Sequence, residues 1–363
     1  MKVFSASPKG LGTGFAHTAA GLPRWSKALA GLFLAVLFML LPLVLNDYAL
    51  GLAGDFGIYA ILGLSLNIIL GHCGLFHMGH SAFFAVGAYS AALLNTMFGM
   101  PILWTIPAGG VFAALFALLV VRPIIHLRGD YLLVVTIGIV EIVRIALVNL
   151  EFTGGANGIL LTDLISILGF EIFTPAHFYY LIFAFLGLSI LLFYFLQNSR
   201  FGRALNYIKQ DELAAEGCGI NTAHYKLTVF VLGAFWAGLT GPIFAAKLTL
   251  VAPSSFTYNE SVLLFAIVIL GGAGSIPGVI LGAFLIVGLP EIFRDLQNYR
   301  LLILGAAMVL MMIFRPKGLI PQVKRHYDAR PLLGLFKNAL GAAPSVAPVP
   351  KRTSAEVRRT DVH

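Results

Sequence analysis

The chain has 363 residues, of which 59% are hydrophobic and 11% are charged. A soluble domain usually carries about 25% charged residues, because its whole surface faces water. This composition therefore excludes a soluble fold and favours a protein whose outer surface faces lipid. The net charge of +8 would suit nucleic acid, but basic residues beside membrane spans stay in the cytoplasm. We expect membrane lipid, and no nucleic acid, as a partner of the basic C-terminal tail.

The segment 1–26 is basic, and we expect it in the cytoplasm. An apolar run follows that is long enough to cross a bilayer. No small-residue cleavage site comes after it, which argues against a cleaved signal peptide. We therefore expect the first span at 27–46. The basic residues at this end are Lys2, Lys9, Arg24 and Lys27.

Further apolar runs have the length of about 20 residues that crosses a ~30 Å hydrocarbon core. The clear spans are 49–70, 80–98, 101–121, 131–150, 177–197, 227–250 and 299–315. Basic residues place the end of the fourth span and the loop 198–226 on the cytoplasmic side of the membrane. The loop 151–176 has acidic residues but no Lys or Arg, so we expect it outside.

The apolar stretch 259–289 is interrupted by the run GGAGSIPG at 271–278, which breaks a helix by its glycines and its proline. We expect two short helices here, 259–271 and 276–289, each about 20 Å long. The result is an all-α polytopic bundle of about ten crossings with both termini inside. The alternative is that these two short helices form a re-entrant pair that never crosses the membrane fully, which leaves about eight crossings. Interrupted segments of this kind line the substrate site in transporters.

Motifs for nucleotide chemistry are missing from the sequence. None of the ten lysines is followed by Ser or Thr, so the chain has no phosphate-binding loop of the type GxxxxGK[ST], and any ATP must be bound by another chain. A GxSxG nucleophile motif is also absent. We therefore expect a transporter subunit rather than an enzyme, with no cofactor.

Three histidines, His72, His77 and His80, surround the first glycine-rich break, with Cys73 beside them. A zinc site needs three or four converging ligands. We expect these histidines to be polar groups that face a cavity or end a helix, and we predict no metal site.

Glu141 and Arg144 lie one turn apart within the span 131–150. Ionisable residues are costly inside a membrane unless they are paired or face a cavity, and this spacing allows a pair. The pair fits either a place on a transport pathway or an interhelix lock. A self-neutralised pair near the membrane interface is an equally good interpretation.

The loop 198–226 is much longer than most connections. It predicts a short amphipathic helix with small residues, Ala214 and Ala215, followed by a glycine turn. Small residues let a partner protein approach closely, which favours a docking element. A plain solvated loop is the alternative.

The run DELAAEGCGIN at 211–221 resembles the coupling loop of ABC importer permeases, and in particular that of branched-chain amino acid permeases of the LivM type. Other stretches agree in order along the chain and together cover roughly 45–320. They are 63–67 with 79–89, 127–131 with 141–144 and 153–158, 271–282, and 314–319. The sequence departs from the family pattern at Cys218, His72 and His77, and the two histidines leave the substrate open.

This resemblance implies the permease subunit of a heteromeric importer in the bacterial inner membrane. Its partners would be a sister permease, two cytoplasmic ATP-binding subunits and a periplasmic substrate-binding protein. The implied ATPase-coupling residues are Glu212, Ala214, Ala215, Glu216, Gly217 and Gly219. Our candidates for the pathway and its gates are Asn67, His72, His77, His80, Glu141, Arg144, Gly271, Gly272, Gly274 and Pro277.

The resemblance implies leucine, isoleucine or valine as cargo, whereas near relatives handle urea, short amides or aromatic acids. An ATP-independent secondary carrier is the alternative from another class, but it leaves loop 198–226 unexplained. We expect a permease domain at 27–320, followed by a basic cytoplasmic tail at 321–363 that is disordered.

Overall fold

The computed structural model describes residues 41–43, 45–127, 129–161, 165–167, 170–292 and part of 302–321. All of them belong to one compact unit, Met1–Gln322. The predicted first span at 27–46 and the predicted tail at 321–363 lie almost wholly outside the described residues. Much of the predicted span 299–315 does too, although its described residues between 302 and 314 are helical.

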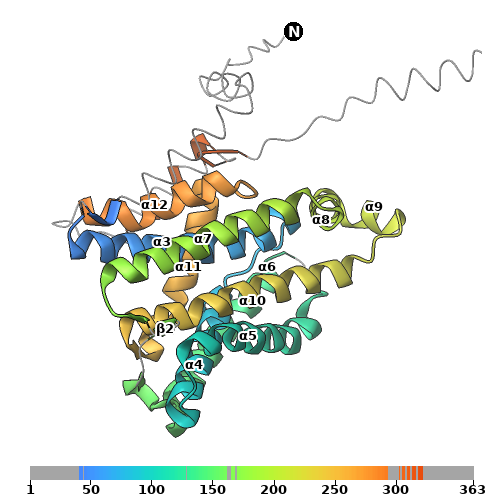
Figure 1. Ribbon diagram of the computed structural model, residues 1–363. Helices are drawn as coiled ribbons and strands as arrows, with labels where there is room; N and C mark the ends of the chain where they lie inside the picture. The colour runs from blue at the N-terminus through green and yellow to red at the C-terminus, as the bar shows by residue number, and fades with distance from the viewer. Residues whose placement is uncertain are drawn as a thin grey trace, which may run out of the picture. The chain divides into compact units, whose positions relative to one another are not determined.

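Helices make up most of the described chain, in agreement with an all-α fold (Figure 1). The α-helices are α3 Asp47–Asn67, α4 His80–Phe98, α5 Ile102–Ile124, α6 Asp130–Asn149, α7 Pro175–Asn198, α8 Arg200–Gln210, α9 Glu212–Gly217, α10 Thr222–Leu248, α11 Tyr258–Gly271 and α12 Ile276–Ile292. A π-helix, η2 Ile68–Cys73, continues α3 without a break. Short 3-10 turns are η1 Leu41–Leu43, η3 Glu151–Thr153, η4 Gly155–Asn157 and η5 Pro253–Ser255.

Four short strands were not predicted from the sequence. β1 (Ile159–Leu160) pairs antiparallel with β4 (Leu250–Val251). β2 (Ile165–Ile167) and β3 (Phe170–Ile172) form a small antiparallel hairpin. Both pairs lie in connections between helices, where a few β-branched residues are too short a run to predict a strand by themselves.

Within the described residues, seven helical segments are long and apolar enough to cross a membrane. They are Asp47–Cys73, His80–Phe98, Ile102–Ile124, Asp130–Asn149, Pro175–Asn198, Thr222–Leu248 and Pro253–Gly271. A shorter apolar helix, Ile276–Gly288, follows them. The chain is therefore a multi-pass helical membrane protein, while the predicted count of about ten crossings is not confirmed.

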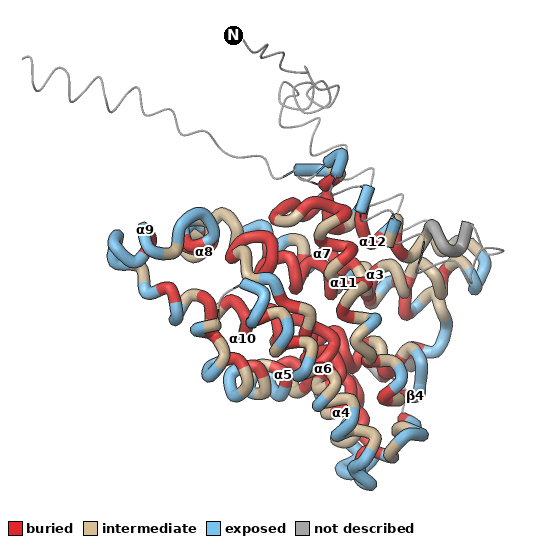
Figure 2. The backbone as a smooth tube through the Cα atoms, turned by 180° about the vertical axis from the view of Figure 1, so that it is seen from behind, coloured by how far each residue is buried: buried red, intermediate tan, exposed pale blue. Residues whose placement is uncertain are grey.

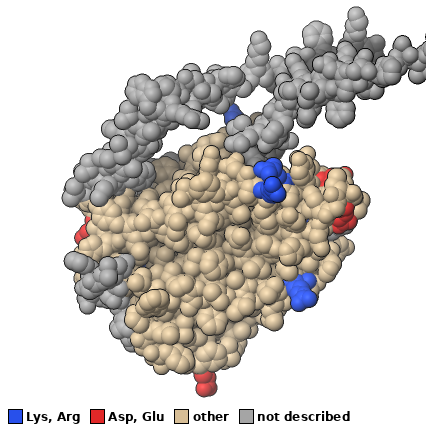
Figure 3. Space-filling view, turned by 45° about the vertical axis from the view of Figure 1, so that its right-hand side comes forward, with Lys and Arg blue, Asp and Glu red and all other residues tan. Residues whose placement is uncertain are grey.

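α3, with its π-helix, and α10 form the centre of the bundle. In the most apolar part of each, 89% and 78% of the residues are buried, against 22% in α6 and 28% in α7. α10 packs against α3, α4 and α5, and α3 packs also against α7, α11 and α12. Figure 2 shows the buried residues along the middle of the bundle. Figure 3 shows an outer face that is mostly uncharged, as a lipid-facing surface requires.

Glycines allow the central helices to touch at the backbone. A Cβ atom at Gly87 in α4 would overlap the backbone of Gly238 in α10. A Cβ atom at Gly238 would in turn overlap the side chain of Ala113 and the backbone of Gly109 in α5. Contacts through small residues are typical of helices packed in membranes, and here they join three helices at one level.

Two helices begin inside the bundle rather than at its ends. After the π-helix the chain turns at Gly74, which has a φ of 76°, and runs back so that α4 begins beside α3. His80 Nε2 lies 2.7 Å from Ser65 Oγ, and Ser65 comes about 12 Å before the end of the π-helix. From the other end, the segment after α10 returns inward until α11 begins. The first turns of α4 and α11 meet, since Ser81 Oγ and Ser261 Oγ are 2.6 Å apart.

Candidate functional site

The predicted loop 198–226 folds into two short helices, α8 and α9, at one end of the bundle (Figure 1). Each turn of the chain there is fixed by an N-cap side chain that accepts a backbone N–H. Ser199 Oγ accepts from Gly202 N at 3.2 Å, and Asp211 Oδ1 accepts from Ala214 N at 3.0 Å. Asn221 Oδ1 accepts from His224 N at 3.1 Å, at the start of α10. The segment is therefore an ordered corner rather than a plain loop.

The outer side of α9 is exposed and contains small and apolar residues. We call it the α9 surface; it comprises Leu213, Ala214, Glu216, Gly217 and Gly219. The side chain of Leu213 is 68% exposed, which is unusual for a large apolar residue next to charged ones. Sequence analysis did not single out Leu213, although its place between acidic and small residues was the available signal.

Two of the predicted coupling residues face the chain itself. Ala215 is only 4% exposed and so contributes no docking surface. Glu212 Oε1 accepts a hydrogen bond of 2.5 Å from Lys226 Nζ at the start of α10. These two residues hold α9 on the bundle, together with Glu216 Oε1, which accepts from Thr222 Oγ1 at 2.6 Å. The rest of the α9 surface remains open.

α8 is attached to the π-helix at the end of α3. Lys209 Nζ donates to the carbonyl oxygen of Gly71 at 2.6 Å, and Asn206 has a side-chain hydrogen bond with His72. A cavity of 270 Å³ lies beside this junction and is lined by charged groups of Lys209, Glu212 and Lys226. The junction therefore combines a direct attachment with free space next to it.

The π-helix in turn contacts the glycine-rich break between α11 and α12. Asn67 Oδ1 accepts from Gly274 N at 2.7 Å, and a Cβ atom at Gly71 would overlap the backbone of Gly274. Gly272 and Gly274 have φ angles of 120° and 93°, a region that favours glycine. Asn67, His72, Gly271, Gly272 and Gly274 are thus brought together near α8.

Pro277 lies at the start of the second short helix, as the predicted bounds 276–289 imply. It lies in the first turn of α12, where the missing N–H of a proline has no helical partner to lose. The break itself is made by the glycines before it, and Pro277 helps to begin the helix that follows. Leu319 N and Ile320 N donate to the carbonyl oxygens of Leu270 and Gly271 at 3.0 Å, which closes the end of α11.

A second cluster of polar side chains lies where α4 and α11 begin inside the bundle. Ser81 N donates to Ser261 Oγ at 3.1 Å, and Ser81 Oγ donates to the carbonyl oxygen of Thr257 at 3.3 Å. Glu260 Oε2 accepts from the hydroxyl of Tyr59 at 2.7 Å. Two helix N-termini, each with a partial positive charge, therefore meet beside the hydroxyl groups of Ser81 and Ser261.

His77 and His80 are fully buried next to this group, with ring centroids 5.5 Å apart. Gly79 N donates to His77 Nδ1 at 3.1 Å, so the proton of the neutral ring is on Nε2. Burial, and to a lesser extent the neighbouring His80, lowers the pKa of His77 well below its ordinary value. Among the described residues, Nε2 of His77 and Nδ1 of His80 have no hydrogen-bond partner. In the part of the chain that the structure describes, no three His, Cys, Asp or Glu side chains converge on a possible metal site.

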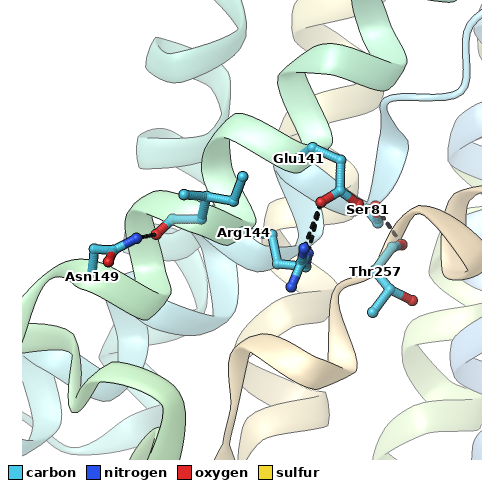
Figure 4. A network of polar contacts seen from close by, with 6 residues as sticks. Ser81, Glu141, Arg144, Asn149 and Thr257 are labelled. Carbon is cyan, nitrogen blue, oxygen red and sulfur yellow. Dashed lines mark hydrogen bonds and ion pairs between the residues drawn. The ribbon is translucent and has the colours of Figure 1, made fainter.

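Glu141 and Arg144 form an ion pair on α6. Arg144 donates to Glu141 Oε2 from Nε at 2.8 Å and from Nη2 at 2.7 Å. The side chain of Arg144 is 35% exposed and that of Glu141 is 37% exposed. α6 packs against both α4 and α11, and Figure 4 shows the pair in one view with the hydrogen bond between Ser81 and Thr257.

Comparisons with known proteins agree over most of the chain. Residues 48–312 match the family described as the permease component of the branched-chain amino acid transport system. The LivM permease protein of the high-affinity branched-chain amino acid transport system of Escherichia coli is 39% identical over 320 residues, 81% of this chain and 75% of that one. The probable LivM permease of Methanocaldococcus jannaschii is 25% identical over 321 residues, 74% of this chain and 91% of that one. The LivH permease of Escherichia coli is 24% identical over 293 residues, 74% of this chain and 93% of that one. No solved structure matches.

Proposed function

Because the chain belongs to the family of branched-chain amino acid transport system permease components, we propose that it forms the membrane pathway of an importer for leucine, isoleucine and valine. The observation that carries this proposal is the 39% identity to a LivM permease over 81% of the chain. The described multi-pass helical bundle has the architecture that such a pathway needs. The chain is a transporter component and not an enzyme.

Transport is driven by ATP that two separate cytoplasmic subunits bind. The α9 surface supports this assignment, because Leu213 is 68% exposed beside small residues that a groove in a partner can enclose. The end of the bundle with α8 and α9 is then the cytoplasmic end, and both termini are cytoplasmic as well. This orientation agrees with the basic residues Arg200, Arg203 and Lys209 near that end.

Movement of the ATP-binding subunits reaches the bundle through α8. Lys209 joins α8 to Gly71 of the π-helix, and Asn67 joins α3 to Gly274 of the glycine-rich break. A displacement of α9 therefore acts on both interrupted segments at once. The cavity of 270 Å³ beside Lys209 and Glu212 leaves room for that displacement.

A sister permease and a periplasmic binding protein complete the importer. The similarity to LivH permeases supports a sister chain of the same fold, and the largely exposed faces of α5, α6 and α7 offer surface for it. The binding protein delivers the amino acid at the end of the bundle opposite α9. The pathway then runs between the two permeases, along helices that are exposed in this chain alone.

Co-purification and uptake test this function. The chain is expressed with the partner subunits, and the complex is purified and reconstituted in liposomes with labelled leucine or urea. We expect ATP-dependent uptake of leucine but not of urea. Gly219→Trp combined with Glu216→Lys should release the ATPase, whereas Glu151→Lys, an exposed acidic residue in a connection after α6, should not. Uptake by the isolated chain without ATP would refute the importer and favour a secondary carrier. Uptake of urea instead of leucine would show that urea is the cargo.

A further inference from the structure

Glu141, the acidic member of the ion pair on α6, lies near the middle of a span. α6 runs from Asp130 to Asn149, so Glu141 is about 16 Å from its first residue and about 12 Å from its last. A charge at that depth is costly against lipid. Arg144 is about 8 Å from the last residue, so the pair reaches from the middle of the span toward one end. At the depth of Glu141 it needs polar surroundings beyond those that the described residues supply.

The contacts of the pair within the described residues add too little stability to explain its presence in a span. Among the described residues, Glu141 and Arg144 are each other's charged partners. An ion pair within one helix contributes about 0.5 kcal/mol or less to stability, and apolar residues of the same size would often serve as well. Both side chains also remain about one-third exposed. The pair thus presents two opposite charges to a neighbour that the described residues do not supply.

The surroundings of the pair combine two kinds of surface. On one side α6 packs against α4 and α11, whose first turns carry hydroxyl groups and the positive ends of two helix dipoles. On the other side Ile142 and Ile145 are 69% and 52% exposed. One turn away, a Cβ atom at Gly138 would meet nothing within 4 Å. α6 therefore carries the pair between its packed side, against α4 and α11, and an open apolar surface.

We propose that Glu141 and Arg144 bind the charged head of the amino acid as it passes through the pathway. The carboxylate of the amino acid takes the guanidinium of Arg144, and its ammonium group takes the carboxylate of Glu141. The aliphatic side chain lies against the apolar surface of Ile142 and Ile145. This assignment rests on the proposed function, because it requires an α-amino acid as cargo.

The advantage of a paired site follows from charge balance. Without cargo, the two side chains neutralise each other. When a zwitterion enters between them, all four charges again have opposite partners, so no charge is left alone in a medium of low dielectric constant. A simple anion, a simple cation or a neutral amide leaves at least one of the two side chains without its partner. The site therefore selects zwitterions without a net charge of its own.

Two double variants of the reconstituted importer test this inference. Glu141→Gln with Arg144→Gln removes both charges, and Glu141→Arg with Arg144→Glu keeps the pair but exchanges its ends. We expect both to assemble with the partner subunits, which co-purification measures. Leucine uptake should fall about 100-fold in the neutral variant, the effect of leaving the charges of a desolvated ligand unpaired. It should also fall in the exchanged variant, because the reversed charges turn the amino acid round and move its aliphatic side chain away from Ile142 and Ile145. Lys247→Gln with Asp55→Asn, which removes an ion pair of 2.5 Å at another place, is the matched control and should keep its uptake.

Photo-crosslinking gives a second measurement that does not depend on turnover. Leucine with a diazirine in its side chain should label a peptide containing Ile142 or Ile145 in the wild-type complex, and the label should be lost in both double variants. Wild-type uptake by the exchanged pair would overturn the inference and show a structural role. Loss of the sister permease from either variant would also overturn it, in favour of an interface lock. Failure of wild-type leucine uptake would instead refute the proposed function itself.

Discussion

The attachment of α8 to the π-helix allows a quantitative test of how the ATP-binding subunits act on the bundle. Lys209→Met removes the ammonium group and keeps most of the aliphatic side chain. The lost hydrogen bond joins Lys209 Nζ to Gly71 O at 2.6 Å, and a bond from a charged donor contributes about 1.5–3 kcal/mol. If the bond transmits movement, the coupling between ATP hydrolysis and leucine transport loses the same free energy. This loss corresponds to a factor of about 10 to 150.

The assay compares leucine uptake with ATP hydrolysis in the same proteoliposomes. We expect Lys209→Met to keep its ATPase activity while the leucine imported per ATP falls at least about tenfold. Lys247→Met is the control, since Lys247 Nζ donates to Gly51 O at 2.7 Å near the opposite end of α3 and pairs with Asp55. This variant should lose thermal stability without loss of coupling. Equal coupling in Lys209→Met and wild type, or equal uncoupling in both variants, would refute the reasoning.

Three other changes test the packing, the buried histidine and the α9 surface. Gly238→Val should lower the stability to unfolding by about 1–3 kcal/mol, because its side chain would overlap Gly109. Thermal melting in detergent measures it, and Gly187→Ala, where a Cβ atom meets nothing within 4 Å, should melt no lower than the wild type, since Ala favours a helix interior over Gly. The lowered pKa of His77 means that the unfolded state binds its proton more readily, so stability falls as the pH drops below about 6.5. His77→Gln should reduce that slope by up to about 1.4 kcal/mol per pH unit, and an unchanged slope in denaturation at pH 5, 6 and 7 would contradict the assignment. Leu213→Ser should release the ATPase in co-purification without changing the melting temperature, because this side chain is 68% exposed; a lowered melting temperature would indicate a structural role instead.

Sequence analysis predicted the spans closely wherever hydropathy decides. The predicted spans 80–98 and 131–150 correspond to α4 and α6 within about one residue at each end. Uninterrupted apolar runs with polar ends can form hardly anything else in a membrane. The predicted short helices 259–271 and 276–289 also correspond to α11 and α12, because glycine and proline mark their ends locally.

Features that depend on distant contacts were not predicted. The depth at which α4 begins follows from the contact of Ser81 with Ser261, which are 180 residues apart in the sequence. Hydropathy has no information about such a contact. In the same way, the sequence alone makes Ala214 and Ala215 equally good candidates for a docking surface. Only the packing of α9 on α10 shows that Ala215 is buried and Ala214 is exposed. The partners of a short helix determine which of its faces is free.

The connection from Lys209 through Gly71 and Asn67 to Gly274 has no preferred direction. Coupling between two binding sites is thermodynamically reciprocal. If nucleotide binding at α9 changes the affinity of the pathway for its cargo, then cargo in the pathway changes the affinity for nucleotide by the same factor. The same contacts that deliver work from ATP would therefore also report an occupied pathway back to the ATP-binding subunits, as a change in their affinity for nucleotide.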